Sequence, residues 1–444
     1  MSAAPTAMAS EAVVDTAVAW WRLVVSVALM VLGASAMYVV SVVLPAVQSE
    51  FGAGRGDVSL SYALSMIGYG IGTLLMGRLT DRFGIMFTVL LGTVCMCIGF
   101  ALASLAPNLI VFVLIHGLLI ALLGGSATMV PLIADTTLWF ERRRGIAVAI
   151  CASGNFFGGA VWPPIVQYFV EGHGWRATYV GIAVVCLLTM LPLALLLRRR
   201  PPGLARPAAT AAASDAAAAP RLDRPLGLAP ATLATLLCVA GIACCVAMAM
   251  PQAHLVAYCT DLGYGAARAA EMLSVLLGFG IVSRLLFGFI CDRIGGLRTL
   301  LLGSVLQAIG LVLFLPFDGL YALYVVSGLF GLFQGGVLPQ YAIIVRENFP
   351  ASRAGAMVGT VMTATMFGMA LGGWMAGVVF DWTGSYNAAF FNAIGWNVLH
   401  IAIIVFLLRR AGPAGRQRGL GLDRSAMNAA ASANAVRATA SIRV

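Results

Sequence analysis

Arg284 is the residue of this chain whose type and position most directly suggest chemistry. The chain has no lysine, and of its 27 arginines Arg284 alone falls inside a long apolar run, at 269–291, away from the ends of that run. An arginine within a membrane helix costs at least a few kcal/mol and by default faces a cavity or a partner. A guanidinium takes both oxygens of a carboxylate through its planar fork and does not deprotonate. The position therefore favours a binding site for an organic anion.

Two other roles for Arg284 stay open. Asp292 follows eight residues later and marks the boundary of the apolar run, so Arg284 lies about 12 Å of helix rise from that boundary. A long arginine side chain reaches part of this distance toward water. The other alternative is a structural ion pair with a neighbouring helix.

His254 is the candidate for a proton carrier. It lies in the apolar run 229–258, three residues after Pro251. Histidine changes its charge near neutral pH, and a proline within a membrane helix frees backbone carbonyls, as transporter sites often do. The alternative is a hydrogen-bonded structural histidine. His116, in the run 108–132, is a weaker candidate of the same kind.

Other polar and amphipathic residues of the apolar runs could line a cavity. For each of them, hydrogen bonding between helices or anchoring at the membrane interface is an equally good explanation. We expect the binding site to draw on Tyr38, Asn155, Trp162, Gln252, Tyr258, Gln334, Tyr341, and also on Gln340 and Asn397.

The composition places most of the chain in lipid. Hydrophobic residues make up 61% and charged residues 10% of the sequence, which is far from the balance of a soluble domain. A helix needs about 20 apolar residues to cross the bilayer, and long unbroken runs do not fit the alternating strands of a β-barrel. Twelve runs qualify, at 22–45, 58–77, 85–106, 108–132, 145–170, 176–197, 229–258, 269–291, 297–316, 319–345, 354–380 and 387–408. We therefore expect an all-α membrane protein with twelve transmembrane helices.

The net charge of +10 is a signal of topology. If the first helix starts in the cytoplasm, the cytoplasmic loops and tail hold 22 of the 27 arginines, and the opposite face holds only Arg55, Arg176 and Arg268. This bias predicts that both termini are cytoplasmic. It also accounts for the basicity without a nucleic-acid partner. The predicted partners are the lipid bilayer and a small solute.

An internal repeat divides the chain. A glycine–aspartate–arginine–glycine pattern occurs twice, 211 residues apart, as Gly77-Arg-Leu-Thr-Asp81-Arg82-Phe-Gly84 and Gly288-Phe-Ile-Cys-Asp292-Arg293-Ile-Gly295. Each copy lies between two apolar runs, and the two pairs of runs correspond in order along the two halves. The repeat predicts two six-helix bundles with the solute bound between them near the midplane. The predicted divisions are a tail at 1–18, a first bundle at 19–198, a linker at 199–228, a second bundle at 229–410 and a tail at 411–444.

The repeat also separates scaffold from function. At the same offset of 211 residues, Arg284 corresponds to Thr73 and His254 corresponds to Val43. The shared scaffold therefore does not require either charged or titratable group, and each needs a reason of its own.

Twelve runs, a six-plus-six repeat, a central linker and two Gly-x-x-x-Asp-Arg-x-Gly loops together resemble the major facilitator superfamily over residues of about 20–410. The resemblance implies that these loops help to lock the cytoplasmic side during alternating access. A carboxylate at a helix end facing a guanidinium makes a latch that depends on conformation. The implied gating residues are Gly77, Asp81, Arg82, Gly84 and Arg144 in the first half, and Gly288, Asp292, Arg293, Gly295 and Arg353 in the second.

A narrower resemblance points to the monocarboxylate porters and oxalate–formate exchangers of that superfamily. It rests on Ser283-Arg284-Leu-Leu-Phe-Gly288, on the Trp139-Phe140 string that leads to Arg144-Gly145, and on Ser153-Gly154-Asn155 with Trp162-Pro163-Pro164. The resemblance implies that Arg284 binds the substrate carboxylate. Two features depart from these relatives: Gly280 stands where the porters usually have an aspartate, and no lysine is present. A monoanion is therefore favoured over a dianion held by two cations.

The expected function is secondary active transport of a small, monocarboxylate-like organic acid by rocking-bundle alternating access, with protons as the candidate coupling ion in symport. The main alternative is an exporter of amphipathic or aromatic compounds in which Arg284 is structural. An enzyme is disfavoured because the runs hold no His-Glu-x-x-His motif and no nucleophile–base pair at helical spacing. We expect no cofactor and no metal. A monomer suffices, and the arginine-only, Ala- and Gly-rich usage indicates a bacterial inner membrane.

Overall fold

The computed structural model describes residues 14–140, 143–199, 226 and 228–411, and within these ranges the chain is helical without strands. The first half holds α2 (Ala17–Gly33), α3 (Ser35–Phe51), α4 (Arg55–Phe83), α5 (Ile85–Ser104), α6 (Leu109–Ile115), η1 (His116–Gly124), η2 (Gly125–Thr128), α7 (Val130–Thr137) and α8 (Arg144–Leu196). The second half holds α10 (Pro230–Asp261), α11 (Ala266–Ile294), α12 (Gly296–Leu313), α13 (Leu320–Gln334), α14 (Val337–Asn348), α15 (Ala351–Thr383) and a last helix, Tyr386–Ala411.

The described part of the chain has eleven helices that are long and apolar enough to cross a membrane. One of them, Gly145–Leu196, has 52 residues and contains a non-helical break at Gly174, where φ is 79°. The predicted runs 145–170 and 176–197 lie on either side of that break. Dividing the helix there gives twelve apolar segments among the described residues, which matches the number of crossings that the sequence predicts.

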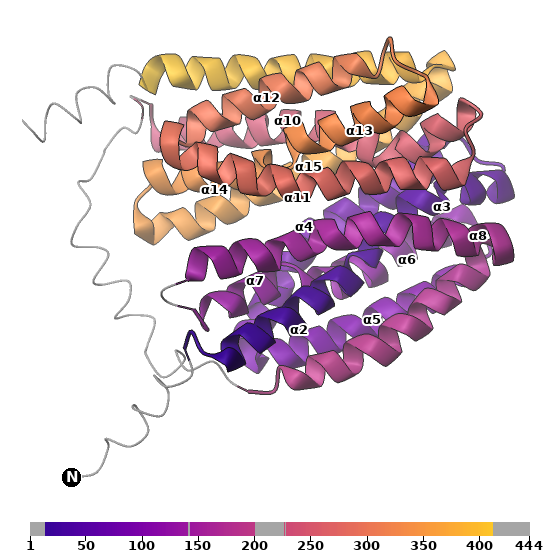
Figure 1. Cartoon of the computed structure of the whole chain (residues 1–444), viewed down its shortest axis with the longest axis horizontal. Coiled ribbons are helices and arrows are strands. Elements are labelled where there is room, and N and C mark those ends of the chain that lie inside the picture. The colour runs from indigo at the N-terminus through magenta and orange to yellow at the C-terminus, as the bar shows by residue number, and fades with distance from the viewer. Residues whose placement is uncertain (1–13, 141–142, 200–225, 227, 412–444) are drawn as a thin grey trace, which may run out of the picture.

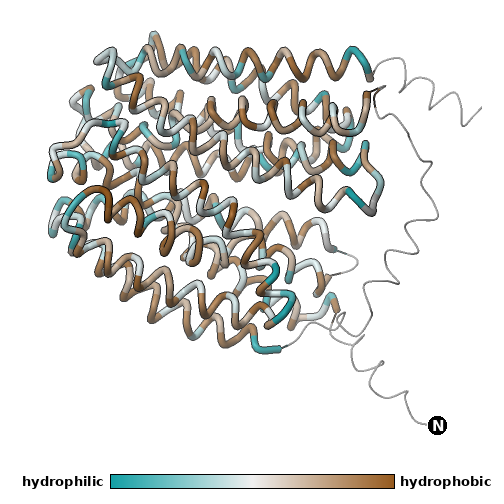
Figure 2. The backbone as a smooth tube through the Cα atoms, turned by 180° about the vertical axis from the view of Figure 1, so that it is seen from behind, coloured by the Kyte–Doolittle hydropathy of each residue, from teal (hydrophilic) through white to brown (hydrophobic). Residues whose placement is uncertain are grey.

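The two halves form two groups of helices that lie side by side. In Figure 1 the helices of the first half slant beneath those of the second, and the two groups converge at one end. Hydrophobic residues predominate along most of the helices (Figure 2), and many large hydrophobic side chains, such as Ile110 and Leu188, are exposed. Exposed apolar side chains of this kind suit contact with lipid. The linker expected at 199–228 and the tails at 1–18 and 411–444 fall mainly outside the described residues.

The repeat is visible in broken helices as well as in the loops. The fourth crossing changes from the π-helix η1 to the 3₁₀-helix η2 at Gly124 and Gly125. The corresponding crossing of the second half breaks between α13 and α14 at Gly335 and Gly336, again 211 residues later. The motif glycines match too, since Gly84 has φ 87° and Gly295 has φ 83°, a region that favours glycine.

The two groups meet along two seams, α4 against α15 and α8 against α11. Since successive crossings alternate in direction, the loops with Arg82, Arg293 and Arg353 share one end of the molecule, the arginine-rich end. The loops near Arg55 and Arg176 share the other, the arginine-poor end.

The seams are tight at the arginine-poor end and open at the arginine-rich end. A Cβ added at Gly377 of α15 would lie 2.7 Å from the Arg55 carbonyl oxygen of α4. Farther along the same two helices, Gly77 and Gly359 would meet no atom within 4 Å, and on the other seam the same holds for Gly145 and Gly288. The structure is therefore in a conformation open toward the arginine-rich end.

Within the second bundle, α13 crosses α11 so closely that only glycine fits at Gly331. A Cβ there would lie 1.9 Å from the carbonyl oxygen of Leu276. We expect Gly331→Ala to destabilise the protein by about 1–3 kcal/mol, because rigid backbone must move aside. A thermal unfolding curve in detergent measures the loss. Gly359→Ala is the control, since it has free space and alanine is the better helix former; equal midpoints for both variants would contradict the crossing.

Candidate functional site

Arg284 of α11 reaches across the seam to the first bundle. Its Nη1 donates a hydrogen bond to the carbonyl oxygen of Ala152 on α8 at 3.1 Å, and its guanidinium carbon lies 4.1 Å from the ring centroid of Phe156. Its Nε is buried, and no described residue forms a hydrogen bond with it. Among the described residues Arg284 forms no ion pair. The side chain thus presents an uncompensated positive charge at the interface between the bundles.

Tyr38 and Asn155 lie beside this arginine. The Tyr38 hydroxyl donates to Asn155 Oδ1 at 3.1 Å. Tyr38 is also close enough to Arg284 for the charge of the guanidinium to act on its hydroxyl group. Both side chains are buried, Tyr38 on α3 and Asn155 on α8. We call Tyr38, Asn155, Phe156 and Arg284 the arginine cluster. It combines a cation, a neutral hydrogen-bonding pair and an aromatic face drawn from both halves of the chain.

Two further tyrosines near this cluster were missed by the sequence analysis. Tyr62 and Tyr69 of α4 are buried, and each lies within electrostatic reach of Tyr38. Within the described ranges the Tyr62 hydroxyl has no hydrogen-bond partner, although buried hydroxyls normally find one. The available signal was the presence of tyrosines in the middle of an otherwise apolar run.

The glycine at position 280 has a structural reason. An added Cβ at Gly280 would lie 2.5 Å from the Phe156 ring. An aspartate one turn before Arg284 would therefore collide with the aromatic ring that now stacks on the guanidinium. Because Phe156 leaves no room for an aspartate at position 280, Arg284 has no carboxylate partner on its own helix.

Several of the other predicted binding residues bond within their own bundle, whereas the buried amide atoms of Asn397 have no hydrogen-bond partner among the described residues. Trp162 Nε1 donates to the Val31 carbonyl at 2.8 Å in the first half. The second half holds the other bonds: Gln252 Nε2 to Gln334 Oε1 at 3.2 Å, Tyr341 with His400 Nε2 at 2.9 Å, and Tyr258 to the Phe314 carbonyl at 3.5 Å. These hydrogen bonds hold helices of one bundle together, which is a structural role. A role of these residues in substrate binding stays a prediction.

His254 is fully buried and has partners from both bundles. Its Nε2 lies 2.8 Å from the Gly373 carbonyl oxygen and 3.3 Å from Ser59 Oγ, and its Nδ1 lies 3.3 Å from the Tyr386 hydroxyl. His116 and His400 are equally buried, but each has its hydrogen-bond partner inside its own half. Among these three buried histidines, His254 alone bonds across the seam.

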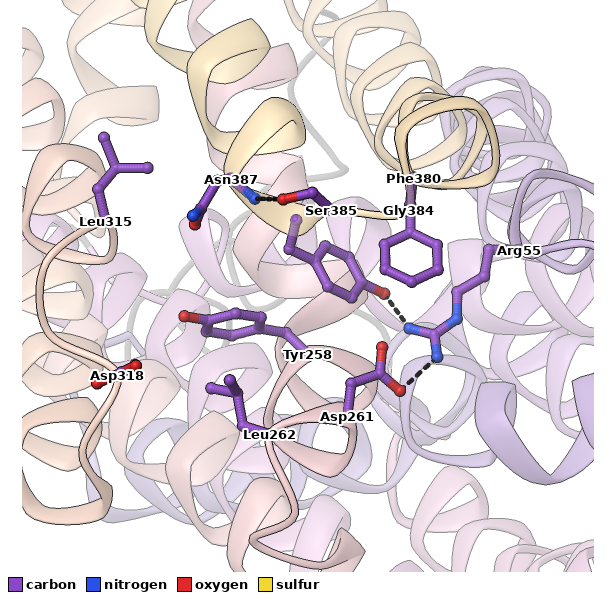
Figure 3. A pocket seen from close by; sticks show the side chains of 11 residues that line it. Arg55, Tyr258, Asp261, Leu262, Leu315, Asp318, Phe380, Gly384, Ser385 and Asn387 are labelled. Atoms are coloured by element: carbon purple, nitrogen blue, oxygen red, sulfur yellow. Dashed lines mark hydrogen bonds and ion pairs between the residues drawn. The ribbon is translucent and has the colours of Figure 1, made fainter.

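A pocket lies at the arginine-poor end, and its lining includes Tyr386, the hydrogen-bond partner of this histidine. Its volume is about 520 Å³, and Figure 3 shows Arg55, Asp261, Tyr258 and Phe380 around it. It lies mostly within the second bundle, and Arg55 is the residue that the first bundle contributes to its lining.

The predicted gating residues lie at the open end. Asp81, Arg82, Asp292, Arg293 and Arg353 are all exposed. In the part of the chain that the structure describes, neither Asp81 nor Asp292 forms an ion pair. The side chain of the predicted partner Arg144 lies outside the described residues. The predicted latch is therefore not formed by the described side chains in this conformation.

Two packed bundles, a repeated Asp-Arg loop and an ionisable site at their interface are typical of one transporter architecture. The sequence model of the Major Facilitator Superfamily matches residues 23–316 and 237–440. The chain belongs to the Major Facilitator Superfamily. It is accordingly a multi-pass membrane transporter and not an enzyme, as the sequence predicted.

Relatives within the superfamily differ in what their names say they carry. The chain is 27% identical to the uncharacterized MFS-type transporter YcxA of Bacillus subtilis, with 76% of this chain and 82% of that protein aligned. It is 27% identical to monocarboxylate transporter 13 of Rattus norvegicus, with 75% and 74% aligned. It is 25% identical to the agnestins efflux protein AgnL12 of Paecilomyces divaricatus, with 66% and 64% aligned. The chain therefore resembles the monocarboxylate branch and also efflux proteins.

A solved structure supports the fold independently. The nucleoside transporter NupG superposes with a TM-score of 0.69 and covers 88% of this chain and 99% of its own, at 12% sequence identity. Identity this low supports the shared major facilitator fold and nothing about the substrate.

Proposed function

We propose that this transporter moves a small, monocarboxylate-like organic anion and that Arg284 binds its carboxylate. The observation that supports this most is the cation at the seam between the bundles without an ion-pair partner among the described residues. A buried charge of this kind is costly unless something compensates it. A substrate carboxylate supplies that compensation each time the site is filled.

The surroundings of Arg284 fit an anion of one charge. The Nε donor has no partner in the part of the chain that the structure describes, so it is available to a carboxylate oxygen through the planar fork of the guanidinium. The Phe156 ring lies 4.1 Å from the guanidinium carbon, so it would help to orient the guanidinium and offer an apolar surface to a substrate tail. The arginine cluster contains one cation, which fits a monoanion better than a dianion.

Transport would follow rocking of the two bundles about this site. Residues of both bundles make up the arginine cluster. Closing the gap between the bundles at either end would therefore change the side of the membrane from which the substrate can reach the cluster. In the opposite conformation the loops with Asp81 and Asp292 would approach Arg144 and Arg353 and latch the arginine-rich end. The positive-inside bias assigns that end to the cytoplasm and both termini with it, and we place the protein in a bacterial inner membrane.

His254 is the proposed carrier of a coupling proton. Among the buried histidines that the structure describes, it is the one that contacts the other bundle, through Ser59 Oγ, so its access to water changes when the bundles rock. Proton symport with the anion would then need no acidic residue near Arg284. The monomer contains every group named here, so we propose that it acts alone.

A second candidate function is export of amphipathic or aromatic compounds. The resemblance to the efflux protein AgnL12 favours it, as do the buried aromatic side chains Tyr38, Tyr62, Tyr69 and Phe156. In that case Arg284 would serve through its bond to Ala152 and its stacking on Phe156.

Uptake by purified protein in liposomes separates the two proposals. We expect labelled short-chain monocarboxylates to enter under an inward proton gradient, and unlabelled acids to compete while the matched neutral amides do not. Competition by amides or neutral aromatic compounds as strong as that by the acids would favour the exporter and reject a carboxylate site.

A further inference from the structure

Arg55, at the start of α4 in the first bundle, is held by side chains of the second bundle. Its Nη2 donates to Asp261 Oδ1 at 2.6 Å and its Nη1 donates to the Tyr386 hydroxyl. Its guanidinium carbon also lies 4.5 Å from the Phe380 ring centroid. Within its own half, its Nε donates a hydrogen bond to Gln48 Oε1 at 3.0 Å. These contacts close the arginine-poor end of the seam, as Figure 3 shows for Arg55 and Asp261.

The second tie at this point is a helix cap from the other bundle. The carboxylate of Asp381 on α15 accepts from the backbone N–H groups of Arg55 at 2.9 Å and Gly56 at 2.7 Å. These are the first two residues of α4, whose own N-cap residue, Gly54, provides no side-chain bond. A carboxylate at a helix N-terminus satisfies free donors and complements the helix dipole. Separating the bundles would remove this cap.

Comparison of the repeats shows that Arg55 is a departure from the scaffold. In the first half Glu50 pairs with Arg176 at 2.7 Å, two residues after the break at Gly174. In the second half Asp261 corresponds to Glu50, and the residue two positions after the matching break at Gly384 is Tyr386. A tyrosine thus replaces the arginine, and the cation that Asp261 needs comes from the other bundle as Arg55.

His254 extends this network into the seam. A carbonyl oxygen only accepts, so Nε2 carries the proton that is donated to Gly373, and Nδ1 of the neutral ring accepts from the Tyr386 hydroxyl. The charged groups that bear on the ring are Arg55 of α4 and Asp381 of α15, and its other polar neighbours are Ser59 and Tyr386. In this closed arrangement the neutral histidine has a partner at each nitrogen and no contact with solvent.

We propose that Arg55, Asp261, Asp381 and Tyr386 form a latch that keeps the arginine-poor end closed, and that protonation of His254 releases it. Burial opposes a charged imidazole in the latched state, and a proton on Nδ1 would remove the acceptor of the Tyr386 hydroxyl. Opening the seam hydrates the ring, so the unlatched state binds a proton more readily. By linkage, acid shifts the equilibrium toward the unlatched state. This proposal rests on alternating access and is independent of the substrate.

A distance measurement across the arginine-poor end tests the latch without any substrate. Spin labels would be placed by His173→Cys and Phe317→Cys, two exposed positions on opposite bundles, in a variant whose nine native cysteines are replaced. Pulsed dipolar spectroscopy then gives the fraction of molecules at the short, latched distance. We expect Arg55→Gln to lower the ratio of latched to unlatched molecules by at least about tenfold, since it leaves a partly buried carboxylate unpaired. Asp381→Asn, which weakens the cap, should act in the same direction.

Arg176→Gln is the matched control, because it removes an ion pair at the same end of the molecule but within one bundle. It should leave the distances unchanged. If Arg55→Gln and Asp381→Asn both kept the parent distribution, or if Arg176→Gln shifted it as much, the latch would be rejected.

The proton site is tested by comparing distances at about pH 8 and about pH 5.5, on either side of the ordinary range of histidine. We expect the parent to open in acid and His254→Gln, which keeps a donor and an acceptor but takes no proton, to stay latched at both values. His116→Gln, which alters an equally buried histidine inside the first bundle, should open like the parent. Acid opening that persists in His254→Gln, or a parent that does not respond to acid, would reject His254 as the proton site.

Discussion

Replacing Arg284 by alanine is expected to abolish uptake of monocarboxylates in reconstituted vesicles. The guanidinium is the cation of the arginine cluster, and losing one member of a desolvated charge pair costs about 2–5 kcal/mol, which is a fall of at least about thirtyfold in affinity. Arg284→Lys keeps the charge but loses the fork, so we expect it to retain only part of the activity. Initial rates at several substrate concentrations measure both effects.

Arg268→Ala controls for loss of an arginine on the same helix, because Arg268 is exposed near the start of α11. Its uptake should match that of the parent. If Arg284→Ala transported monocarboxylates at the rate of the parent, Arg284 would be structural and the carboxylate site would lie elsewhere.

Arg22→Ala is expected to cause the largest loss of stability. Arg22 of α2 binds both oxygens of Asp135 on α7, at 2.9 and 3.2 Å, and donates to the Leu197 and Arg199 carbonyls. The two side chains are 6% and 4% exposed, so removing the arginine leaves a carboxylate buried without its cation. Breaking a buried pair in this way costs about 3–5 kcal/mol. Thermal unfolding in detergent should show a large drop in midpoint.

The double variant Arg22→Met with Asp135→Leu separates charge from packing. Replacing both partners by apolar residues of similar size should recover most of the lost stability, since no buried charge remains unpaired. A double variant as unstable as Arg22→Ala would mean that the carbonyl bonds of Arg22, rather than the ion pair, hold α2 in place.

Much of the fold follows from local features of the sequence. Apolar length predicts the crossings, and the return of Gly84 as Gly295 predicts two matching turns, which have matching φ values. The break at Gly174 likewise falls in the gap between two predicted runs. Membership of the superfamily, inferred from these features, is confirmed by the family match.

The way in which the site residues come together could be predicted from the sequence only in part. The sequence singled out Arg284, Tyr38 and Asn155 separately, and the structure brings them together. Arg55 entered the sequence analysis only as part of a charge bias, because its partners Asp261 and Tyr386 are 206 and 331 residues away. Pairing over such separations depends on how two bundles pack, which helical periodicity does not specify. Tyr386 does not stand out in the sequence, because the corresponding residue of the first half is an arginine, Arg176, and the two do not match as a repeat.

We propose that Arg284, which forms no ion pair among the described residues, binds the carboxylate of the substrate. Titration calorimetry of the purified transporter with a monocarboxylate and with its matched amide tests this most directly, in the parent and in Arg284→Ala. We predict binding of the acid to the parent alone, with no heat from the amide and none from the variant with either compound. Equal binding of acid and amide, or acid binding that survives in Arg284→Ala, would contradict the account.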